Sequence, residues 1–403
     1  MTWRKNLFAV TAASFIGFTG FTLVMPFLPL YFQQLGVTDV GEIALWSGLS
    51  LGVTPAVTAL MAPIWGRVAD RVGRKVMVER SLVSFVIVMA TMAFVTAAWQ
   101  VFALRALQGL FAGYGALTLT MAADSAPRER VAQAIGTVQT AQRLGPALGP
   151  VIGGTVAQLV GLRRAFFVTA AFYLVAVVLV FVLYHERPQT HAAGADDRRV
   201  TFRNVLAFEN FILLMVVVFA FQFVDRSFGP ILPLYVADLG TAGDAVPILS
   251  GVLFSIAAGA AALGNHLCGA LLRRFSARVV IAGAASGAAA GTLVYVLAGS
   301  LAPLMLATAL FGVAVGAATT AAYTAASSVV PGAARGAGFG LLTTASLAGL
   351  AISPIASGLL GAVNIRAVFV IDTIALIVLA ALVRRLMVAA PLTPTSAPAA
   401  EEL

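Results

Sequence analysis

The fold of this chain is decided by one short charged stretch, GRVADRVGRK at residues 66–75. It lies between two long apolar segments, and it is too polar to enter a bilayer and too short to form a domain. Gly66 and Gly73 allow a sharp turn, because glycine adopts backbone angles that other residues avoid. Asp70 lies among basic residues, so an ion-pair network is available there. The simplest interpretation is a solvated basic loop that fixes only the topology.

The composition indicates an integral membrane protein. Of the 403 residues, 60% are hydrophobic and only 10% are charged, whereas soluble domains carry roughly 25% charged residues. The net charge of +9 does not indicate a nucleic-acid partner, because the basic residues lie in short loops between apolar spans, where they orient the chain in the lipid bilayer. The single cysteine, Cys268, excludes a disulfide framework and is expected to be a small buried apolar residue.

Apolar runs separated by polar loops predict twelve transmembrane helices, since each crossing takes about 20 residues. The predicted spans are 7–32, 44–65, 77–97, 99–124, 134–158, 165–184, 207–236, 247–270, 279–299, 302–327, 339–361 and 365–387. A polar linker at 185–206 separates an N-terminal six-helix half, 1–184, from a C-terminal six-helix half, 207–390. The tail at 391–403 is rich in Pro, Thr and Ala and is predicted to be disordered. We therefore expect an all-α membrane protein.

The two halves are sequence copies. PFLPLY at 26–31 recurs as PILPLY at 230–235, with the same offset relating the glycines and proline of the fifth span to those of the eleventh. An even number of crossings in each half gives both copies one orientation, which is a parallel repeat about an axis along the membrane normal. Most Lys and Arg residues lie on one side, and only Arg163, Arg164 and Arg366 lie in loops on the other, so both termini are predicted to be cytoplasmic.

The 66–75 stretch resembles the signature loop between helices 2 and 3 of the major facilitator superfamily of transporters. The resemblance implies alternating access by two rocking halves, with this loop as a cytoplasmic latch. The latch residues it implies are Gly66, Asp70, Arg71, Gly73, Arg74 and Lys75. In related exporters an acidic residue at the end of the fourth helix meets this loop. We therefore expect Asp124 to contact Arg71 or Arg74, with Glu79 as a second candidate.

The fifth span resembles a motif of the superfamily's exporters and antiporters. Gly145, Gly149 and Gly153 recur every four residues and form a smooth stripe that lets another helix approach closely. Together with Pro146, Pro150 and Gly154, this stripe is predicted to act as a hinge and seal between the halves. Ordinary helix packing is the alternative.

The candidates for ion coupling are Arg105, Asp225 and Arg226. The Arg-x-x-Gln-Gly pattern at Arg105 resembles the fourth-helix motif of proton-coupled members, although a snorkelling or structural arginine is the alternative. Asp225 is the only acid deep in a central span, and we hypothesise that it titrates, tuned by Arg105 or Arg226. Neighbouring helical side chains point about 100° apart, so Asp225 and Arg226 are not expected to pair with each other. A fixed ion pair is the alternative.

The remaining charged residues of the spans agree less well with the superfamily's exporters. The first span has no acid between residues 7 and 32, unlike many drug exporters of this superfamily. Asp372 and Arg143 have no partner that the sequence indicates.

The expected binding pocket is apolar and aromatic, since such side chains adapt to varied ligands. Its candidate lining residues are Phe18, Phe21, Thr22, Met25, Tyr114, Gln222 and Tyr323, for each of which helix packing is the alternative.

The sequence lacks a phosphate-binding loop, a metal-ligand cluster and a nucleophile elbow, so neither an enzyme nor a cofactor is expected. The energy must then come from a gradient, and by resemblance the ion is H⁺. We expect a monomeric efflux transporter of small amphipathic compounds such as drugs, in a bacterial inner membrane. A facilitator or symporter of one metabolite and a non-transporting receptor or scaffold remain as alternatives.

Overall fold

Helices account for all the regular structure that the computed structural model describes, which covers residues 2–127, 130–185, 206, 208–330 and 335–388. Most of the predicted linker and the whole predicted tail lie outside these described residues. Fourteen helices fall within them. Nine of those are long and apolar enough to cross a membrane. Of the others, α2, α5 and α6 are short pieces of interrupted spans, α4 carries four charged residues in its sequence RKVMVER, and α7 is long but carries Arg143 and several glutamines.

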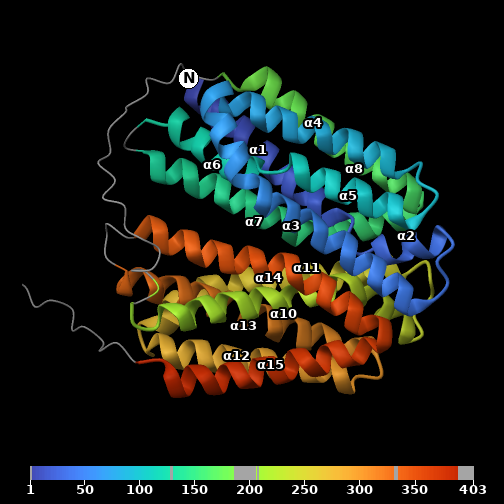
Figure 1. Ribbon diagram of the computed structural model, residues 1–403, viewed down its shortest axis with the longest axis vertical. Coiled ribbons are helices and arrows are strands. Elements are labelled where there is room, and N and C mark those ends of the chain that lie inside the picture. Colours follow the sequence, from blue (N-terminus) through green and yellow to red (C-terminus); the bar gives the residue numbers. More distant parts are fainter. Residues whose placement is uncertain (1, 128–129, 186–205, 207, 331–334, 389–403) are drawn as a thin grey trace, which may run out of the picture.

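The first eight helices form one bundle, drawn in blue to green in Figure 1. Their bounds are α1 Thr2–Leu23, α2 Leu28–Gln34, α3 Val40–Val72, α4 Arg74–Met92, α5 Ala98–Phe111, α6 Tyr114–Ser125, α7 Val131–Val160 and α8 Leu162–Leu183. Within this bundle α1 packs on α7 and α8, α3 on α5, and α4 on α8. Its core is built from buried aliphatic and aromatic side chains such as Phe27, Phe85 and Phe166.

The remaining helices form a second bundle, drawn in yellow-green to red in Figure 1. They are α10 Phe211–Asp238, α11 Val246–Leu272, α12 Ala277–Leu297, α13 Leu301–Val329, α14 Arg335–Val363 and α15 Ile365–Leu386. The repeat seen in the sequence has a structural counterpart. The Tyr31 hydroxyl donates to the Met92 carbonyl at 2.6 Å, and the Tyr235 hydroxyl donates to the Tyr295 carbonyl at 2.6 Å.

Two spans predicted to be continuous are broken. The first is α1 followed by α2, with turns at 24–27, and the fourth is α5 followed by α6, with Ala112 and Gly113 between them. Gly113 has a φ of 123°, a value open chiefly to glycine. Pro29 lies in the first turn of α2, where its missing N–H costs no hydrogen bond. The repeat copy in α10 instead runs unbroken through Pro230 and Pro233.

The charged stretch at 66–75 is not a loop. Residues 66–72 continue α3, and α4 begins at Arg74, so Gly73 alone makes the turn, with a φ of 104°. The helix continues because Gly66 and its charged neighbours adopt helical angles once they are anchored by the long apolar helix before them.

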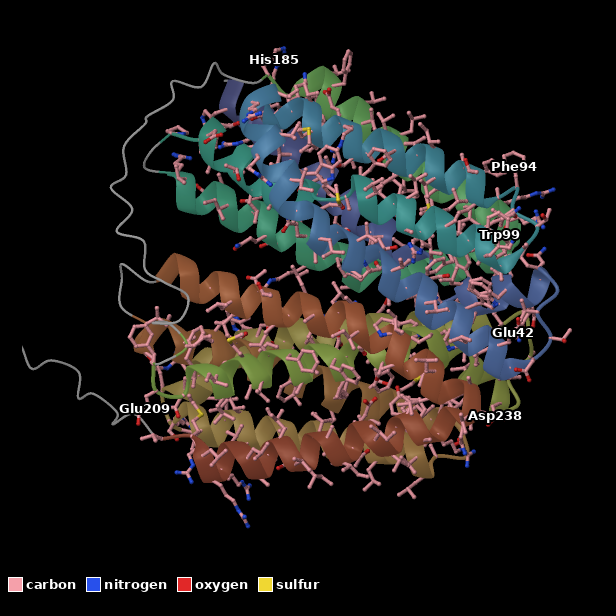
Figure 2. All side chains as sticks on the ribbon, in the orientation of Figure 1. Glu42, Phe94, Trp99, His185, Glu209 and Asp238 are labelled. Atoms are coloured by element: carbon pink, nitrogen blue, oxygen red, sulfur yellow. The ribbon has the colours of Figure 1, made fainter. Side chains whose placement is uncertain are left out.

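The two bundles meet mainly through α3 against α14 and α7 against α11. In Figure 2, Glu42, Trp99 and Asp238 lie at one end of the molecule, the far end, and His185 and Glu209 lie at the other, the terminal end. The bundles touch toward the far end, where Gly48 lies against the Pro354 carbonyl and Gly358, and Gly154 against Pro247. Figure 1 shows the bundles diverging toward the terminal end.

Candidate functional site

A cavity of about 790 Å³ lies between the two bundles. Helix α1, with Met25 just after it, and α7 line it from the first bundle, and α10, α11, α12, α13 and α14 line it from the second. Most of the lining is alanine, aliphatic and aromatic, with polar groups such as Gln142, Gln222 and Asn265. Its volume falls within the roughly 300–1,000 Å³ of small-molecule pockets.

Six of the predicted pocket residues line this cavity: Phe18, Phe21, Thr22, Met25, Gln222 and Tyr323. Tyr114 does not. It is 7% exposed, and its ring packs behind Phe18 at 5.5 Å and against Phe85 at 5.8 Å. It occupies that place because Gly17 leaves room beside its hydroxyl.

Sequence reasoning missed the contribution of α11. Ala257, Ala258, Ala261 and Ala262 line the cavity together with Phe254. Their spacing of three to four residues puts them on one helical face, so a small-residue stripe in the eighth span was a usable signal. Phe339 of α14 was also missed, and it stacks on Tyr323 with ring centroids 6.1 Å apart and an interplanar angle of 4°.

Asp225 and Arg226 pair with each other in the cavity wall, contrary to the expectation from their helical spacing. The Arg226 Nε lies 3.2 Å from the Asp225 Oδ2, and the side chains are 28% and 27% exposed. The pair forms because the long, flexible Arg226 side chain folds back along the helix, which the angle between neighbouring Cα–Cβ bonds does not capture. Both residues line the cavity, so the pair is open to water and ligand.

Arg105 of α5 is 1% exposed and lies apart from that pair. Its Nη1 donates to Gln108 Oε1 at 2.8 Å, and its guanidinium carbon lies 5.9 Å from the Phe21 ring centroid. Within the described part of the chain no carboxylate pairs with it. Arg105 and Arg226 do line one small cavity of about 20 Å³ between the bundles, so Arg105 approaches the Asp225–Arg226 pair from its arginine side.

The glycine stripe of α7 packs within the first bundle and not between the bundles. A Cβ on Gly145 would lie 2.8 Å from the Thr19 nitrogen, and Gly149 and Gly153 likewise abut Thr22 and the Leu23 carbonyl of α1. The stripe packs on α1 because the glycines leave no bulky side chain between the two helices. Gly154 and Pro150 instead contact α11, and Pro146 and Pro150 line the cavity.

Arg143, for which the sequence indicated no partner, also lines the cavity. With the Asn265 amide turned to satisfy its neighbours, the Asn265 oxygen accepts from Arg143 Nη1 at 2.9 Å, and its nitrogen donates to Thr320 Oγ1 at 2.8 Å. This chain of hydrogen bonds links α7 to α11 and α13, and therefore joins the two bundles through polar side chains.

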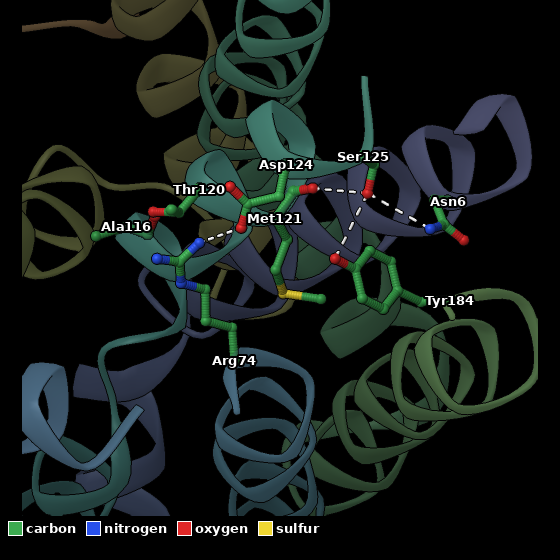
Figure 3. Close-up of polar contacts among 8 residues, drawn as sticks. All are labelled: Asn6, Arg74, Ala116, Thr120, Met121, Asp124, Ser125 and Tyr184. Carbon is green, nitrogen blue, oxygen red and sulfur yellow. Dashed lines mark hydrogen bonds and ion pairs between the residues drawn. The ribbon is translucent and has the colours of Figure 1, made fainter. Parts of the chain in front are cut away.

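The charged turn after α3 makes its contacts inside the first bundle. Figure 3 shows Arg74 paired with Asp124 at the end of α6. Lys75 lies 3.7 Å from Glu79 and donates to the Phe181 and Tyr184 carbonyls at 3.0 and 2.8 Å. This turn therefore ties α4 to α6 and α8. Arg71 is exposed, and the Asp70 side chain lies outside the described residues.

A second cluster of polar contacts lies beside the Arg74–Asp124 pair, toward the start of α1 (Figure 3). Asn6 donates to Ser125 Oγ at 3.4 Å and to the His185 carbonyl at 2.9 Å, and it accepts from the His185 nitrogen at 3.1 Å. The Tyr184 hydroxyl lies 3.5 Å from the Ser125 Oγ. The terminal end of the first bundle is thus fastened by side chains from α1, α4, α6 and α8.

Comparison with known sequences gives one family and relatives with similar names. The sequence model described as Major Facilitator Superfamily matches residues 10–302 and 214–402. A "Multi-drug resistance efflux pump PmrA homolog" of Lactococcus lactis subsp. lactis (strain IL1403) is 33% identical over 285 residues, covering 70% of each chain. A "Multidrug resistance protein MdtG" of Rahnella sp. (strain Y9602) is 35% identical over 286 residues, covering 70% of this chain and 69% of the relative.

Solved structures share the fold at low sequence identity. A bacterial homolog of the human lysosomal transporter Spinster, in an inward-facing and occupied conformation, superposes with a TM-score of 0.79 at 18% identity, covering 94% of this chain and 96% of its own. A point mutant of the nucleoside transporter NupG has a TM-score of 0.73 at 14% identity, covering 93% of this chain and 98% of its own.

Proposed function

The chain belongs to the major facilitator superfamily, and we propose that within it the protein is a secondary active efflux transporter of small amphipathic compounds, driven by H⁺ antiport. Its relatives at about one-third identity carry names of multidrug resistance and efflux proteins. The observation that carries the proposal is the cavity of about 790 Å³ between the bundles, lined by aromatic rings and by one ion pair. Such a lining accepts varied apolar ligands and keeps one titratable group in contact with them.

In the membrane, α1 with α2 and α5 with α6 each make one crossing, which gives twelve crossings in two halves, 1–184 and 207–390. The terminal end faces the cytoplasm, and the chain is a multi-pass monomer of the bacterial inner membrane with both termini inside. The basic stretch at 66–75 supports this orientation, since basic residues favour the cytoplasmic side. The cavity is then open to the cytoplasm in this conformation and is ready to load substrate.

Transport requires the far-end contacts between the bundles to separate while the terminal ends come together. The latch of that second state would be formed by Asp124 together with residues of the 66–75 stretch, namely Gly66, Asp70, Arg71, Gly73, Arg74 and Lys75. In the present state the Arg74–Asp124 pair keeps α4 and α6 together, so the latch surface moves as one rigid part of the first bundle. Gly145, Gly149 and Gly153 hold α7 on α1, while Pro150 and Gly154 form the seal with α11.

Asp225 is the proposed coupling residue, and Arg226 is its partner. Protonation of Asp225 would release Arg226, which lies beside Arg105 in the small cavity between the bundles. A cationic substrate that displaces this proton would exchange one positive charge for another. Arg105 then acts on Asp225 through Arg226, because both arginines line the same small cavity.

The test is dye efflux from cells that express the protein, with and without a protonophore. Wild-type protein should lower the accumulation of a lipophilic cationic dye, and the protonophore should abolish that effect. Asp225→Asn should bind the dye and fail to concentrate it outward, whereas Glu42→Gln, at the exposed far end, should behave as wild type. Proton-driven efflux that is unchanged in Asp225→Asn would refute the coupling role.

A facilitator or symporter of one metabolite is the second candidate. It is favoured by the lack of any acidic residue in the sequence from 2 to 34, which covers α1 and α2. It predicts transport that persists with a protonophore, or substrate accumulation inside the cell, and both outcomes would contradict efflux by antiport.

A further inference from the structure

Asp372 of α15 is a carboxyl group buried inside the second bundle. It is 1% exposed, and its Oδ2 lies 2.5 Å from the Ser227 Oγ of α10. Among the ion pairs of the described residues none includes Asp372. Transferring an isolated carboxylate from water into a medium of low dielectric constant is strongly unfavourable, so such a group takes up a proton instead.

The hydrogen bonds around Ser227 also support a protonated Asp372. The Ser227 Oγ lies 2.8 Å from the Val224 carbonyl as well as 2.5 Å from Asp372. A hydroxyl has one hydrogen to donate, and neither a carbonyl nor an ionised carboxylate can donate one. Both contacts are hydrogen bonds when Ser227 donates to Val224 and a protonated Asp372 donates to Ser227.

The helices packed on α15 bring titratable groups near Asp372 but no cation against it. From α12 comes Tyr295, whose hydroxyl bonds Thr308, and from α10 comes Tyr235, whose hydroxyl donates to the Tyr295 and Ala298 carbonyls. The only charged residue in the α14 sequence is Arg335, at its first position, and its side chain lies outside the described residues. Other charges lie at helix ends or in the cavity wall: Arg366 with Asp238, Arg278, Arg384, Arg385, and the Asp225–Arg226 pair.

Aromatic rings of the cavity wall lie close to the residues around Asp372. Phe228, the neighbour of Ser227, lines the cavity, as does Tyr295. The Phe228 ring packs at 5.0 Å on Tyr295 and at 5.3 Å on Phe369, which lies one turn before Asp372. A ligand that displaces Phe228 would therefore admit water to the Ser227–Asp372 contact.

We propose that Asp372 is a second proton-binding group of the transport cycle, loaded in the conformation seen here and discharged when substrate displaces the Phe228 wall. The step is a proton transfer alone: the Asp372 O–H bond breaks, its electron pair stays on the carboxylate, and the proton passes to cavity water. This inference rests on the proposed antiport. Asp225, held by Arg226 in the cavity, and Asp372, held by Ser227 behind it, lie on either side of the same stretch of α10.

The test combines infrared spectroscopy with proton release from the full-length protein in weakly buffered detergent, using tetraphenylphosphonium as the probe. A carbonyl band of a protonated carboxylic acid should be present in the wild type, lost in Asp372→Asn and shifted in Ser227→Ala. The probe should weaken that band. Proton release on binding should be smaller by one proton per bound probe in Asp372→Asn, which retains the size and hydrogen-bonding capacity of the side chain.

The outcomes separate the two proposals. A missing band in the wild type, or proton release that is unchanged in Asp372→Asn, overturns the role of Asp372 and leaves antiport through Asp225 standing. A band without any proton release from the wild-type protein overturns the antiport itself, and the coupling role of Asp372 with it. Ser227→Ala provides the second variant, because it keeps the carboxyl group and removes only its hydroxyl partner.

Discussion

Gly154→Ala should shift the protein away from the conformation that is closed at the far end. Gly154 of α7 meets α11 there, and a Cβ at this position would lie 2.8 Å from the Pro247 carbonyl carbon and 2.9 Å from the Ile248 Cα. Both obstacles are backbone atoms, so no side chain can rotate away to make room. The added methyl group is accommodated only if α7 and α11 separate, which is the movement that opens the far end.

The size of the effect follows from the cost of overpacking a close contact, about 1–3 kcal/mol. If the strain is present only while the far end is closed, that free energy changes the ratio of the two conformations by about 5-fold to 150-fold. Alanine also favours helix over glycine by roughly 0.8–1 kcal/mol, but this gain applies equally to both conformations and cancels from their ratio.

The assay is a distance measurement by electron paramagnetic resonance between nitroxide labels at Gln133 and Arg274, in a Cys268→Ala background. Both positions are exposed: Gln133 lies in the first turn of α7, and Arg274 lies two residues after the end of α11. The distance between the labels is longer when the terminal ends are apart and shorter when they come together. Gly154→Ala should increase the population with the shorter distance. Gly136→Ala is the matched control on the same helix, since a Cβ there meets nothing within 4 Å. A distance distribution identical to wild type in Gly154→Ala would refute the far-end seal.

Two further substitutions test other parts of the site. Tyr323→Ala should raise the KM for aromatic drugs about 2-fold to 12-fold, because an aromatic contact contributes about 0.5–1.5 kcal/mol, while Tyr323→Phe should retain wild-type KM; an equal change for aliphatic substrates in transport assays would contradict a stacking role. Asp124→Asn should lower stability by no more than about 1 kcal/mol in thermal denaturation, since the pair with Arg74 is partly exposed. Its transport rate should fall further than that of Glu79→Gln, and equal rates would argue against a latch role.

Hydropathy and charge predicted the membrane class, because a helix that crosses a bilayer needs a long apolar run. The family was predicted from the resemblance of the stretch at 66–75 to the superfamily's signature motif. The position of the cavity lining in the first span was also predictable, since Phe18, Phe21 and Thr22 share one face of α1 and Met25 follows in the turn after it. The break after α1 was not. Nearly the same six residues run from the turn into α2 at 26–31 and lie inside the continuous helix α10 at 230–235, so the packing around each copy decides the outcome.

Side-chain partners were harder to predict, because they depend on where flexible groups settle. Asp225 and Arg226 pair although their Cα–Cβ bonds diverge, and the long arginine side chain is the reason. The stripe from Gly145 to Gly153 predicted a close helix contact but could not identify the partner, which is α1. The partner of Asp372 could not be predicted from the sequence, because Ser227 lies 145 residues away in the chain.

Transport in proteoliposomes with an imposed pH gradient tests antiport most directly. Purified protein is reconstituted without other components, and movement of a fluorescent lipophilic cation is followed after the gradient is established. Antiport predicts that the compound accumulates on the more acidic side, that accumulation collapses with a protonophore, and that Asp225→Asn leaves only equilibration. Accumulation that is independent of the pH gradient, or equilibration alone in the wild type, would contradict proton-driven efflux.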